Sequence, residues 1–424
     1  MVRPVYGNGR NALVRCLQIS AAIGTSKRFA GIATIMPGTT SPYSLASLLI
    51  FYLPLAIAAV SALYYLAVLF ASLKFLFEDD PAPGFTPPVS ILNPVRGLEP
   101  DFYACLASHC RQDYPQFEII FGLNDPADPA IAAIEQLRRD FPRVPIKIVV
   151  APEIRCANLK MNSLERMLEE ASYDIVVIND ADIRVPPDYL RNVVAPLADN
   201  CVGMVTCLYR GVPAEGLAAS LEALGIGGDF TGQVLLARMV EGIKFALGAT
   251  MATRKKQIVE IGGLAPWSDY LADDYVLGNQ IARAGYRIHL SHTVVDTLLP
   301  RRTLIELLRQ QVRQARTVRF SRPRSYPGLL LSFGIPFALL ALCARPYSAE
   351  VWSVLPILFV ARLGAAWVSG VEVARDNFIR EFFLLLPLRD FVALGVWLAS
   401  FLGKTVVWRG ARYAIEPGGK IRPV

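Results

Sequence analysis

Long apolar runs on both sides of a more polar middle region constrain the fold of this chain more than any other feature. The first run covers residues 45–77 and is interrupted only by small polar residues and Lys74. It is long enough to cross the roughly 30 Å hydrocarbon core of a bilayer as one helix. Because further apolar runs follow between residues 329 and 407, we expect membrane helices at both ends of a water-exposed domain.

The later apolar runs are 329–343, 351–368 and 382–407. The last of them contains Pro387, Arg389 and Asp390, which interrupt a spanning helix. We therefore expect residues 382–388 to lie at the membrane interface and residues 391–407 to span. A cytosolic tail that follows a cytosolic domain requires an even number of spans between the two. Because there are three candidate spans after the domain, the sequence does not decide on which side of the membrane the C-terminal tail lies.

Composition and charge narrow the class of protein. Apolar residues make up 53% of the chain and charged residues 19%, a balance too apolar for an ordinary soluble domain. The net charge is +7, and arginines gather at 301–324 and 409–422, beside the apolar runs. This placement indicates contact with lipid headgroups and argues against a nucleic-acid partner. The seven cysteines show no CxxC pair, so we expect free thiols on a reducing, cytoplasmic face.

Residues 1–43 contain arginines but no signal of a folded domain. Met36 stands directly before Pro37 and Gly38, just ahead of the first apolar run. We expect either that translation begins at Met36, so that residues 1–35 are not translated, or that the segment is a disordered extension.

The middle region, residues 87–300, alternates short β-branched runs with segments of helical spacing. Strands are predicted at 89–92, 117–123, 146–150 and 174–178, and helices at 100–110, 131–141 and 162–170. Further candidate strands are 202–207, 245–252 and 287–290. This alternation predicts an α/β fold with a doubly wound, mostly parallel sheet, in which ligands bind outside the carboxyl ends of the strands.

Two carboxylates follow the strand predicted at 174–178. Asp180 and Asp182 are two residues apart, so on an extended segment they would point the same way. Such a pair can bind Mg²⁺ or Mn²⁺, hard cations that prefer oxygen ligands and leave positions for phosphate oxygens. The ion would neutralise a departing nucleoside diphosphate. A polar turn or a helix cap is the alternative, but the position after a buried strand favours a metal and donor site.

Two further acids follow the strand predicted at 117–123. Asp125 could accept hydrogen bonds from the uracil or ribose of a nucleotide donor, and Asp128 suits the cap of a helix that begins near Ala130. Spacing alone favours neither role over its alternative. Lys160 could meet the donor diphosphate as a point charge, and we include it in the donor site, although without further context a solvated lysine would be the favoured interpretation.

Asp273 and Asp274 open a helical pattern after an apolar approach. Acids in a first turn commonly interact with the helix dipole. One acid is enough for that interaction, and here there are two. We therefore expect one of them to face a pocket and to act as a general base that reaches an acceptor hydroxyl. We assign the base to Asp274 and a supporting place in the donor site to Asp273.

A basic amphipathic helix is predicted within residues 301–324. Its arginines at helical spacing are Arg302, Arg309, Arg313, Arg316 and Arg319. We expect this helix to lie on the membrane surface with most arginines at headgroups, while Gln310 and Arg313 turn toward the donor phosphates. Membrane and interfacial helices over 325–407 and a basic tail over 408–424 would follow.

Together, the acids, the basic helix and the spans indicate a membrane enzyme that transfers a sugar from a nucleotide donor to a lipid hydroxyl. One alternative is a processive polysaccharide synthase, which usually needs more spans to form a channel. Another is a non-catalytic membrane scaffold with a decayed transferase domain, against which the intact acids argue.

The order of these motifs closely resembles the ceramide glucosyltransferase family, glycosyltransferase family 21, and most of all its bacterial hopanoid-biosynthesis-associated members. The resemblance covers the chain from residue 45 onward. The matching stretches are PVSILNP at 88–94, RQDYP at 111–115, NDPADPA at 124–130, DADIRV at 180–185, GATM at 248–251, LADDYVLG at 271–278 and WRGARY at 408–413.

The resemblance implies a GT-A fold, a UDP-sugar donor, a divalent metal and inversion at the anomeric carbon. It also implies a bacterial inner-membrane protein with its catalytic domain on the cytoplasmic face. The family's first acid falls on Asp125, its second on Asp180 and its base on Asp274. Its (Gln/Arg)-x-x-Arg-Trp motif falls on Gln310, Arg313 and Gln314.

Two departures from the family pattern concern the acceptor side. Gln314 stands where the family has Trp, and residues 227–229 read Gly-Gly-Asp where relatives often have His. The sequence leaves open glucose or N-acetylglucosamine as the sugar, a hopanoid or ceramide as the acceptor, and the oligomeric state.

Overall fold

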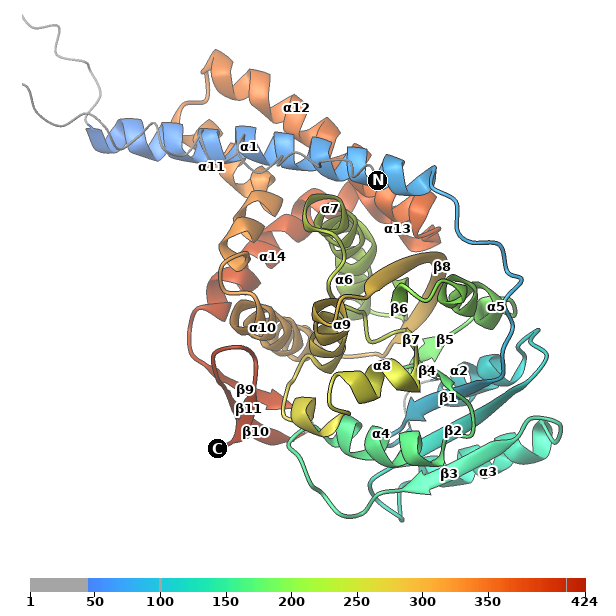
Figure 1. Cartoon of the computed structure of the whole chain (residues 1–424). Coiled ribbons are helices and arrows are strands. Elements are labelled where there is room, and N and C mark those ends of the chain that lie inside the picture. The colour runs from blue at the N-terminus through green and yellow to red at the C-terminus, as the bar shows by residue number, and fades with distance from the viewer. Residues whose placement is uncertain (1–44, 99–100, 409) are drawn as a thin grey trace, which may run out of the picture. The chain divides into compact units, whose positions relative to one another are not determined.

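The computed structural model describes residues 45–98, 101–408 and 410–424 (Figure 1). The segment 1–43, with the alternative start at Met36, lies outside the described residues. Residues Ala46–Val424 form one compact unit.

An eight-stranded sheet forms the centre of the α/β region, in the order β3-β2-β1-β4-β7-β6-β8-β5. The strands are β1 (Val89–Pro94), β2 (Phe117–Leu123), β3 (Ile146–Val150), β4 (Ile175–Ile178), β5 (Ile183–Arg184), β6 (Val202–Pro213), β7 (Met251–Arg254) and β8 (Arg287–Leu299). Strands β1 to β4 pair in parallel, as do β6 and β8, whereas β7 runs antiparallel to β4 and β6, and β5 to β8. The predicted α/β fold with a mostly parallel sheet is confirmed, and β2 and β3 have the predicted bounds.

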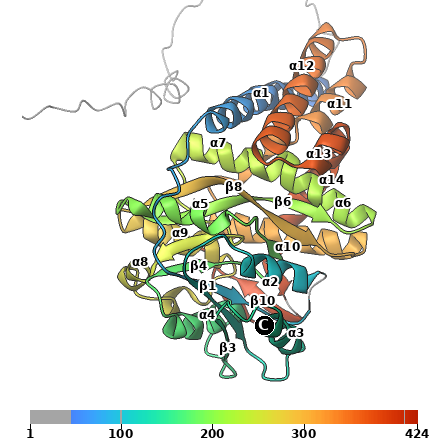
Figure 2. The same ribbon diagram turned by 90° about the vertical axis from the view of Figure 1, so that its right-hand side faces the viewer.

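Helices cover both faces of this sheet because neighbouring residues of a buried strand point to opposite sides. Ile91 belongs to the apolar cluster with α2 (Phe102–Cys110), α3 (Ala130–Asp140) and α5 (Tyr189–Val194). Leu92, the next residue, belongs to the cluster with α4 (Leu159–Glu170), α8 (Lys255–Glu260) and α9 (Asp273–Arg283). Figure 2 shows these layers from the side.

β6, β7 and β8 differ most from their predicted bounds. β7 begins at Met251 rather than at residue 245, because the chain first makes a turn in which Thr250 donates its backbone N–H to the carbonyl of Leu247. β6 and β8 extend to Pro213 and Leu299, well past their predicted ends, because they pair with each other along this whole length.

The first predicted apolar run forms one helix, α1 (Leu45–Leu76), and its role as a span stays a prediction. The later helices are α11 (Gly334–Ala344), α12 (Ala349–Ala366), α13 (Asn377–Phe382) and α14 (Leu386–Ser400). Within the described residues, three helical segments are long and apolar enough to cross a membrane: Leu48–Leu76, Ala349–Val373 and Asn377–Ser400. A fourth candidate joins Tyr326–Ser332 to α11 through a bend of 62°. Figures 1 and 2 both show α1, α11 and α12 together at one end of this unit, where their apolar side chains pack.

The last apolar run ends differently from the prediction. The helix stops at Ser400, and residues predicted to continue the span form β9 (Thr405–Trp408). Gly403 has a φ of 95°, which ends the helix, and the following residues are β-branched or aromatic. β9 pairs with β10 (Ala411–Ile415), and β10 with β11 (Ile421–Pro423), so residues predicted as a basic tail form a three-stranded antiparallel sheet.

The predicted basic helix is present as α10 (Leu304–Ser321), but two of its arginines do not face headgroups. Arg316 donates to the carbonyl of Thr405 at 2.6 Å and to that of Leu402. Arg319 donates to the carbonyl of Gly403 at 2.8 Å. These arginines hold the segment that leads into the C-terminal sheet, because its turn leaves carbonyl groups without strand partners.

A buried arginine joins two candidate membrane helices to the Gly-Gly-Asp departure. Arg362 of α12 pairs with Asp390 of α14 at 2.9 Å and with Asp229, and it donates to the carbonyl of Gly228 at 2.9 Å. Residues Ile226–Phe230 form a π-helical turn there. A buried charge is tolerated only when it is paired with an opposite charge. The ion pairs of Arg362 with Asp390 and Asp229 therefore hold α12, α14 and this turn together.

Candidate active site

Lys160 holds two of the predicted acids together where β4 ends. Its Nζ lies 2.7 Å from Asp180 Oδ1 and 3.0 Å from Asp273 Oδ2. Burial acts to lower the pKa of Lys160, but the negative charges of Asp180, Asp273 and Asp274 outweigh it and raise that pKa well above its ordinary value. The interpretation of Lys160 as a solvated lysine is therefore wrong, because its side chain is a buried cation among carboxylates.

Asn158 positions both Lys160 and the loop that precedes α9. Its Oδ1 accepts the backbone N–H of Lys160 at 3.0 Å and so caps α4. Its Nδ2 donates to the carbonyl of Tyr270 at 2.9 Å and to Asp273 Oδ1 at 3.3 Å. One amide therefore fixes the starts of α4 and α9 relative to each other.

Asp274 directs its carboxylate at the backbone of Gly248. Its Oδ2 accepts the N–H of Gly248 at 2.8 Å, and its Oδ1 accepts the N–H of Tyr275 at 2.7 Å. Burial and the charge of Asp273 raise the pKa of Asp274 to about 6, although Lys160 acts in the opposite direction. A carboxylate with this pKa can take a proton near neutral pH.

Glycine at position 248 allows the backbone to approach both acids. A Cβ there would lie 2.9 Å from Asp180 Oδ2 and 3.3 Å from Asp274 Oδ2. A larger residue would therefore push the two carboxylates away from their present positions.

Asp182 lies in the turn between β4 and β5 rather than on an extended segment. Its Oδ2 accepts the hydroxyl hydrogen of Thr297 at 2.9 Å, and its carbonyl accepts the N–H of Leu298 at 3.0 Å. β8 thus holds Asp182 in place, and Asp180 and Asp182 both line the same cavity.

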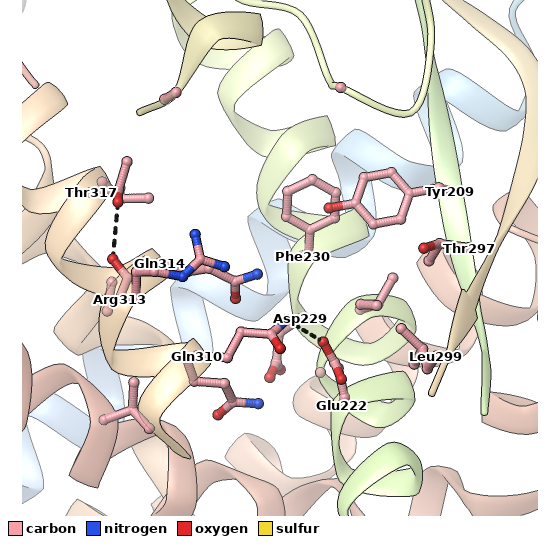
Figure 3. A pocket seen from close by; sticks show the side chains of 18 of the residues that line it. Tyr209, Glu222, Asp229, Phe230, Thr297, Leu299, Gln310, Arg313, Gln314 and Thr317 are labelled. Atoms are coloured by element: carbon pink, nitrogen blue, oxygen red, sulfur yellow. Dashed lines mark hydrogen bonds between the residues drawn. The ribbon is translucent and has the colours of Figure 1, made fainter. Parts of the chain in front are cut away.

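That cavity has a volume of about 630 Å³ and brings together all of the predicted site residues except Asp125. The predicted residues in its lining are Lys160, Asp180, Asp182, Asp273, Asp274, Gln310 and Arg313. Figure 3 shows Gln310, Arg313 and Gln314 of α10 across the cavity from Glu222 and Asp229. Gln310 donates to Glu222 Oε1 at 2.8 Å, so the predicted motif contacts α6 (Leu217–Gly225).

The same cavity has an apolar and aromatic wall. Tyr326, Leu329 and Phe333 come from the bent segment before α11, and Val396 and Trp397 from α14. The carboxylates therefore share one cavity with residues of the candidate membrane segments.

Asp125 lies elsewhere. It is exposed on the loop after β2, where its Oδ1 accepts the N–H of Ala127 at 2.8 Å, and its donor-binding role stays a prediction. Asp128 is buried and accepts the N–H groups of Gly97 and Ala130, each at 2.9 Å. The assignment of Asp128 to the start of α3 is confirmed.

The sequence did not predict several residues that line or support the cavity, among them Asn158, Tyr209, Glu222 and Gly248. Glu222 carried a usable signal, because it is the one acid in the otherwise apolar or small segment Leu217–Gly225. Burial raises the pKa of Glu222 although Arg302, 3.3 Å from its Oε2, acts to lower it. For Asn158 the sequence could predict only a helix-capping role. Its contacts with Tyr270 and Asp273 could not be predicted, because they join distant parts of the chain.

A comparison with solved structures agrees with this architecture. The mannosyltransferase PcManGT from Pyrobaculum calidifontis, solved in complex with GDP-Man and Mn²⁺, matches with a TM-score of 0.50 and 22% sequence identity. The match covers 82% of this chain and 99% of that one. The fold is that of the GT-A-type glycosyltransferases.

The sequence comparisons define the family. The model of glycosyl transferase family 21 matches residues 53–421, and the chain belongs to that family. Ceramide glucosyltransferase 1 of Caenorhabditis elegans is 23% identical over 357 residues, which cover 81% of this chain and 74% of the relative. A ceramide glucosyltransferase of Gibberella zeae is 33% identical over 158 residues, covering 33% of this chain and 30% of the relative.

Proposed function

We propose that this chain is an inverting membrane glycosyltransferase that moves a sugar from a UDP-sugar to a hydroxyl group of a lipid. The observation that carries the proposal is the single cavity in which Asp180 and Asp274 share walls with Tyr326, Phe333 and Trp397. A water-soluble acceptor needs no aromatic wall beside candidate membrane helices, whereas a lipid needs both that wall and a polar reaction centre.

In this proposal Asp274 is the general base. The acceptor hydroxyl gives its proton to the carboxylate of Asp274, and its oxygen attacks the sugar C1 from the face opposite UDP. The bond between C1 and the diphosphate oxygen breaks, so one displacement inverts the anomeric configuration. Lys160 and Arg313 supply positive charge in the cavity for the diphosphate, with Gln310 beside Arg313 and Asp273 holding Lys160.

The donor set fits a divalent cation that is shared with the substrate. Among the described residues, no three His, Cys, Asp or Glu side chains are grouped to hold a metal on their own. Asp180 and Asp182 both line the cavity, and Mg²⁺ or Mn²⁺ commonly takes one or two carboxylates plus phosphate oxygens and water. These two residues would hold the ion, which when bound offsets the negative charge of the leaving diphosphate.

The acceptor we propose is a hopanoid, with ceramide as the second candidate. The motif resemblance favours the hopanoid, while the relatives named ceramide glucosyltransferase favour the second. Glucose and N-acetylglucosamine are both candidate sugars. We place the protein in the bacterial inner membrane, with the catalytic domain on the cytoplasmic face and the candidate spans in the bilayer.

The test is transfer by the purified full chain in lipid nanodiscs, supplied in turn with UDP-glucose or UDP-N-acetylglucosamine and with a hopanoid polyol or ceramide. Lipid mass spectrometry should show one acceptor gaining the mass of one sugar, and the same product should disappear from a host that lacks the gene. UDP release without any glycolipid, or transfer only to a water-soluble acceptor, would contradict the proposal.

A further inference from the structure

One part of the cavity contains buried polar atoms that lack partners. Glu222 of α6, Gln311 of α10 and Arg389 of α14 all line it, and each is 8% exposed. Within the described part of the chain, Gln311 Oε1 and Arg389 Nη1 accept or donate no hydrogen bond. Glu222 Oε2 likewise has no hydrogen bond and faces Arg302 only as an ion pair at 3.3 Å.

Such atoms call for an explanation. A buried donor or acceptor without a partner destabilises a protein, and native structures contain few of them. Here α10 and α14 each contribute one such atom to the same cavity. The carboxylate of Glu222 from α6, which pairs with Gln310 and Arg302, lies in the same lining, so a shared ligand is the simplest explanation.

Arg389 is the most informative of the three. It lies within the candidate span Asn377–Ser400, where a charged side chain is costly and marks a functional site. Its Nε donates to the carbonyl of Leu221 at 3.2 Å, which fixes the guanidinium plane beside α6. At position 225 a Cβ would meet Arg389 Nη2 at 2.6 Å, so Gly225 makes room for the guanidinium group.

The three groups are complementary to a hydroxylated headgroup. Arg389 Nη1 can only donate a hydrogen bond, whereas the oxygens of Gln311 and Glu222 accept. A hydroxyl group does both, so a ligand with several hydroxyls, or with hydroxyls and an amide, could satisfy all three. Tyr326 and Trp397, in the same lining, would take the apolar part of such a molecule.

We propose that Glu222, Gln311 and Arg389 form a subsite that binds the secondary polar groups of the acceptor, apart from the hydroxyl that receives the sugar. The substrate class is then a lipid with two or more hydroxyl or amide groups beside the reacting hydroxyl, not a simple fatty alcohol. This inference rests on the proposed function. A lipid without those groups would leave Gln311 Oε1 and Arg389 Nη1 unpaired, which is how a hydrogen-bonding site rejects an analogue.

The experiment compares two acceptors of equal chain length, a long-chain primary alcohol and the corresponding vicinal triol. For the wild type we expect kcat/KM to be at least 10-fold, and up to about 100-fold, higher for the triol, as one or two hydrogen bonds to charged or buried groups would give. Arg389→Met and Gln311→Met should each reduce this ratio by about 10-fold. Arg380→Met, at an exposed residue of α13 outside the cavity lining, should leave the ratio as in the wild type.

The dissociation constant of the UDP-sugar, measured on every variant, reports whether the protein is folded. If Arg389→Met no longer binds the donor, Gln311→Met decides, because methionine has nearly the length of glutamine and lacks only its polar groups. An unchanged ratio in a variant that still binds donor would overturn the subsite and leave the proposed function standing. Failure of the wild type to glycosylate the alcohol, the triol, a hopanoid polyol or ceramide, with donor binding intact, would instead overturn the proposed function and the subsite with it.

Discussion

Replacing Asp274 by Asn tests whether the ionised carboxylate of Asp274 lowers the free energy of unfolding of the protein. The pKa of Asp274 rises from an ordinary 3.8 to about 6, mainly through burial and the neighbouring charge of Asp273. About two pH units correspond to about 3 kcal/mol of free energy lost by the folded state when Asp274 is ionised. Because the folded pKa is the higher one, this loss develops as pH rises from about 4 to about 6 and is complete above that window.

Asn removes the charge but also one acceptor. It can keep only one of the two backbone bonds that Asp274 accepts from Gly248 and Tyr275, at a cost of about 1 kcal/mol. The expected balance at neutral pH is therefore a gain of about 1–2 kcal/mol, seen as a rise in Tm of about 2–5 °C. At pH 4 the gain should vanish, since the wild-type carboxyl is then protonated in the folded state.

Turnover of Asp274→Asn should fall even though its stability rises. Loss of a positioned base lowers the rate by about 10²–10⁴, and the wild-type decline in kcat below about pH 6 should be absent from the residual activity of Asp274→Asn. The assay is glycolipid formation and Tm on the same preparation across pH 4–8, with Asp199→Asn, an exposed acid remote from the cavity, as control. Turnover within a few-fold of wild type would show that Asp274 is not the base, and Asp273 would be tested next. A lower Tm at neutral pH would refute the argument that the ionised form is destabilised.

Three further outcomes follow from the site and its supports. EDTA should abolish transfer and Mg²⁺ or Mn²⁺ restore it, through Asp180 and Asp182; full turnover in chelator would remove the metal role. Lys160→Met should destabilise the protein by about 3–5 kcal/mol in thermal or denaturant unfolding, because it leaves Asp180 and Asp273 without their buried cation, and an unchanged Tm would contradict that pairing. Ile421→Ala should lower kcat about 10-fold with little change in UDP-sugar affinity, because buried Ile421 packs with Leu271 in the loop before α9. The control Arg422→Ala, at the exposed neighbouring residue, should behave as wild type. Equal kcat in both variants would argue against a role for this packing.

The parts of the structure that could be predicted are those governed by local pattern. The runs at 117–123 and 146–150 became strands with those bounds because alternating apolar residues serve two buried faces. The acids after β4 and before α9 could be assigned to a site because each follows a buried or apolar segment. Lys160 could not be placed, since its burial depends on Asp180 and Asp273, which lie far along the chain. The C-terminal sheet was missed because its strands are short and their charged residues resemble an interfacial tail.

That C-terminal sheet has a consequence for the order in which the protein acquires activity. The N–H of Ile421 donates to the carbonyl of Asp269 at 2.7 Å, and Gly419 accepts from Leu271 at 3.4 Å, so β11 contacts the segment that leads to Asp273 and Asp274. Ribosomes deliver this strand after every candidate span. A nascent chain can therefore form its sheet while the segment that leads to Asp274 still lacks this neighbour. If Asp274 acts as proposed, we expect transfer to begin only once the chain is synthesised through β11.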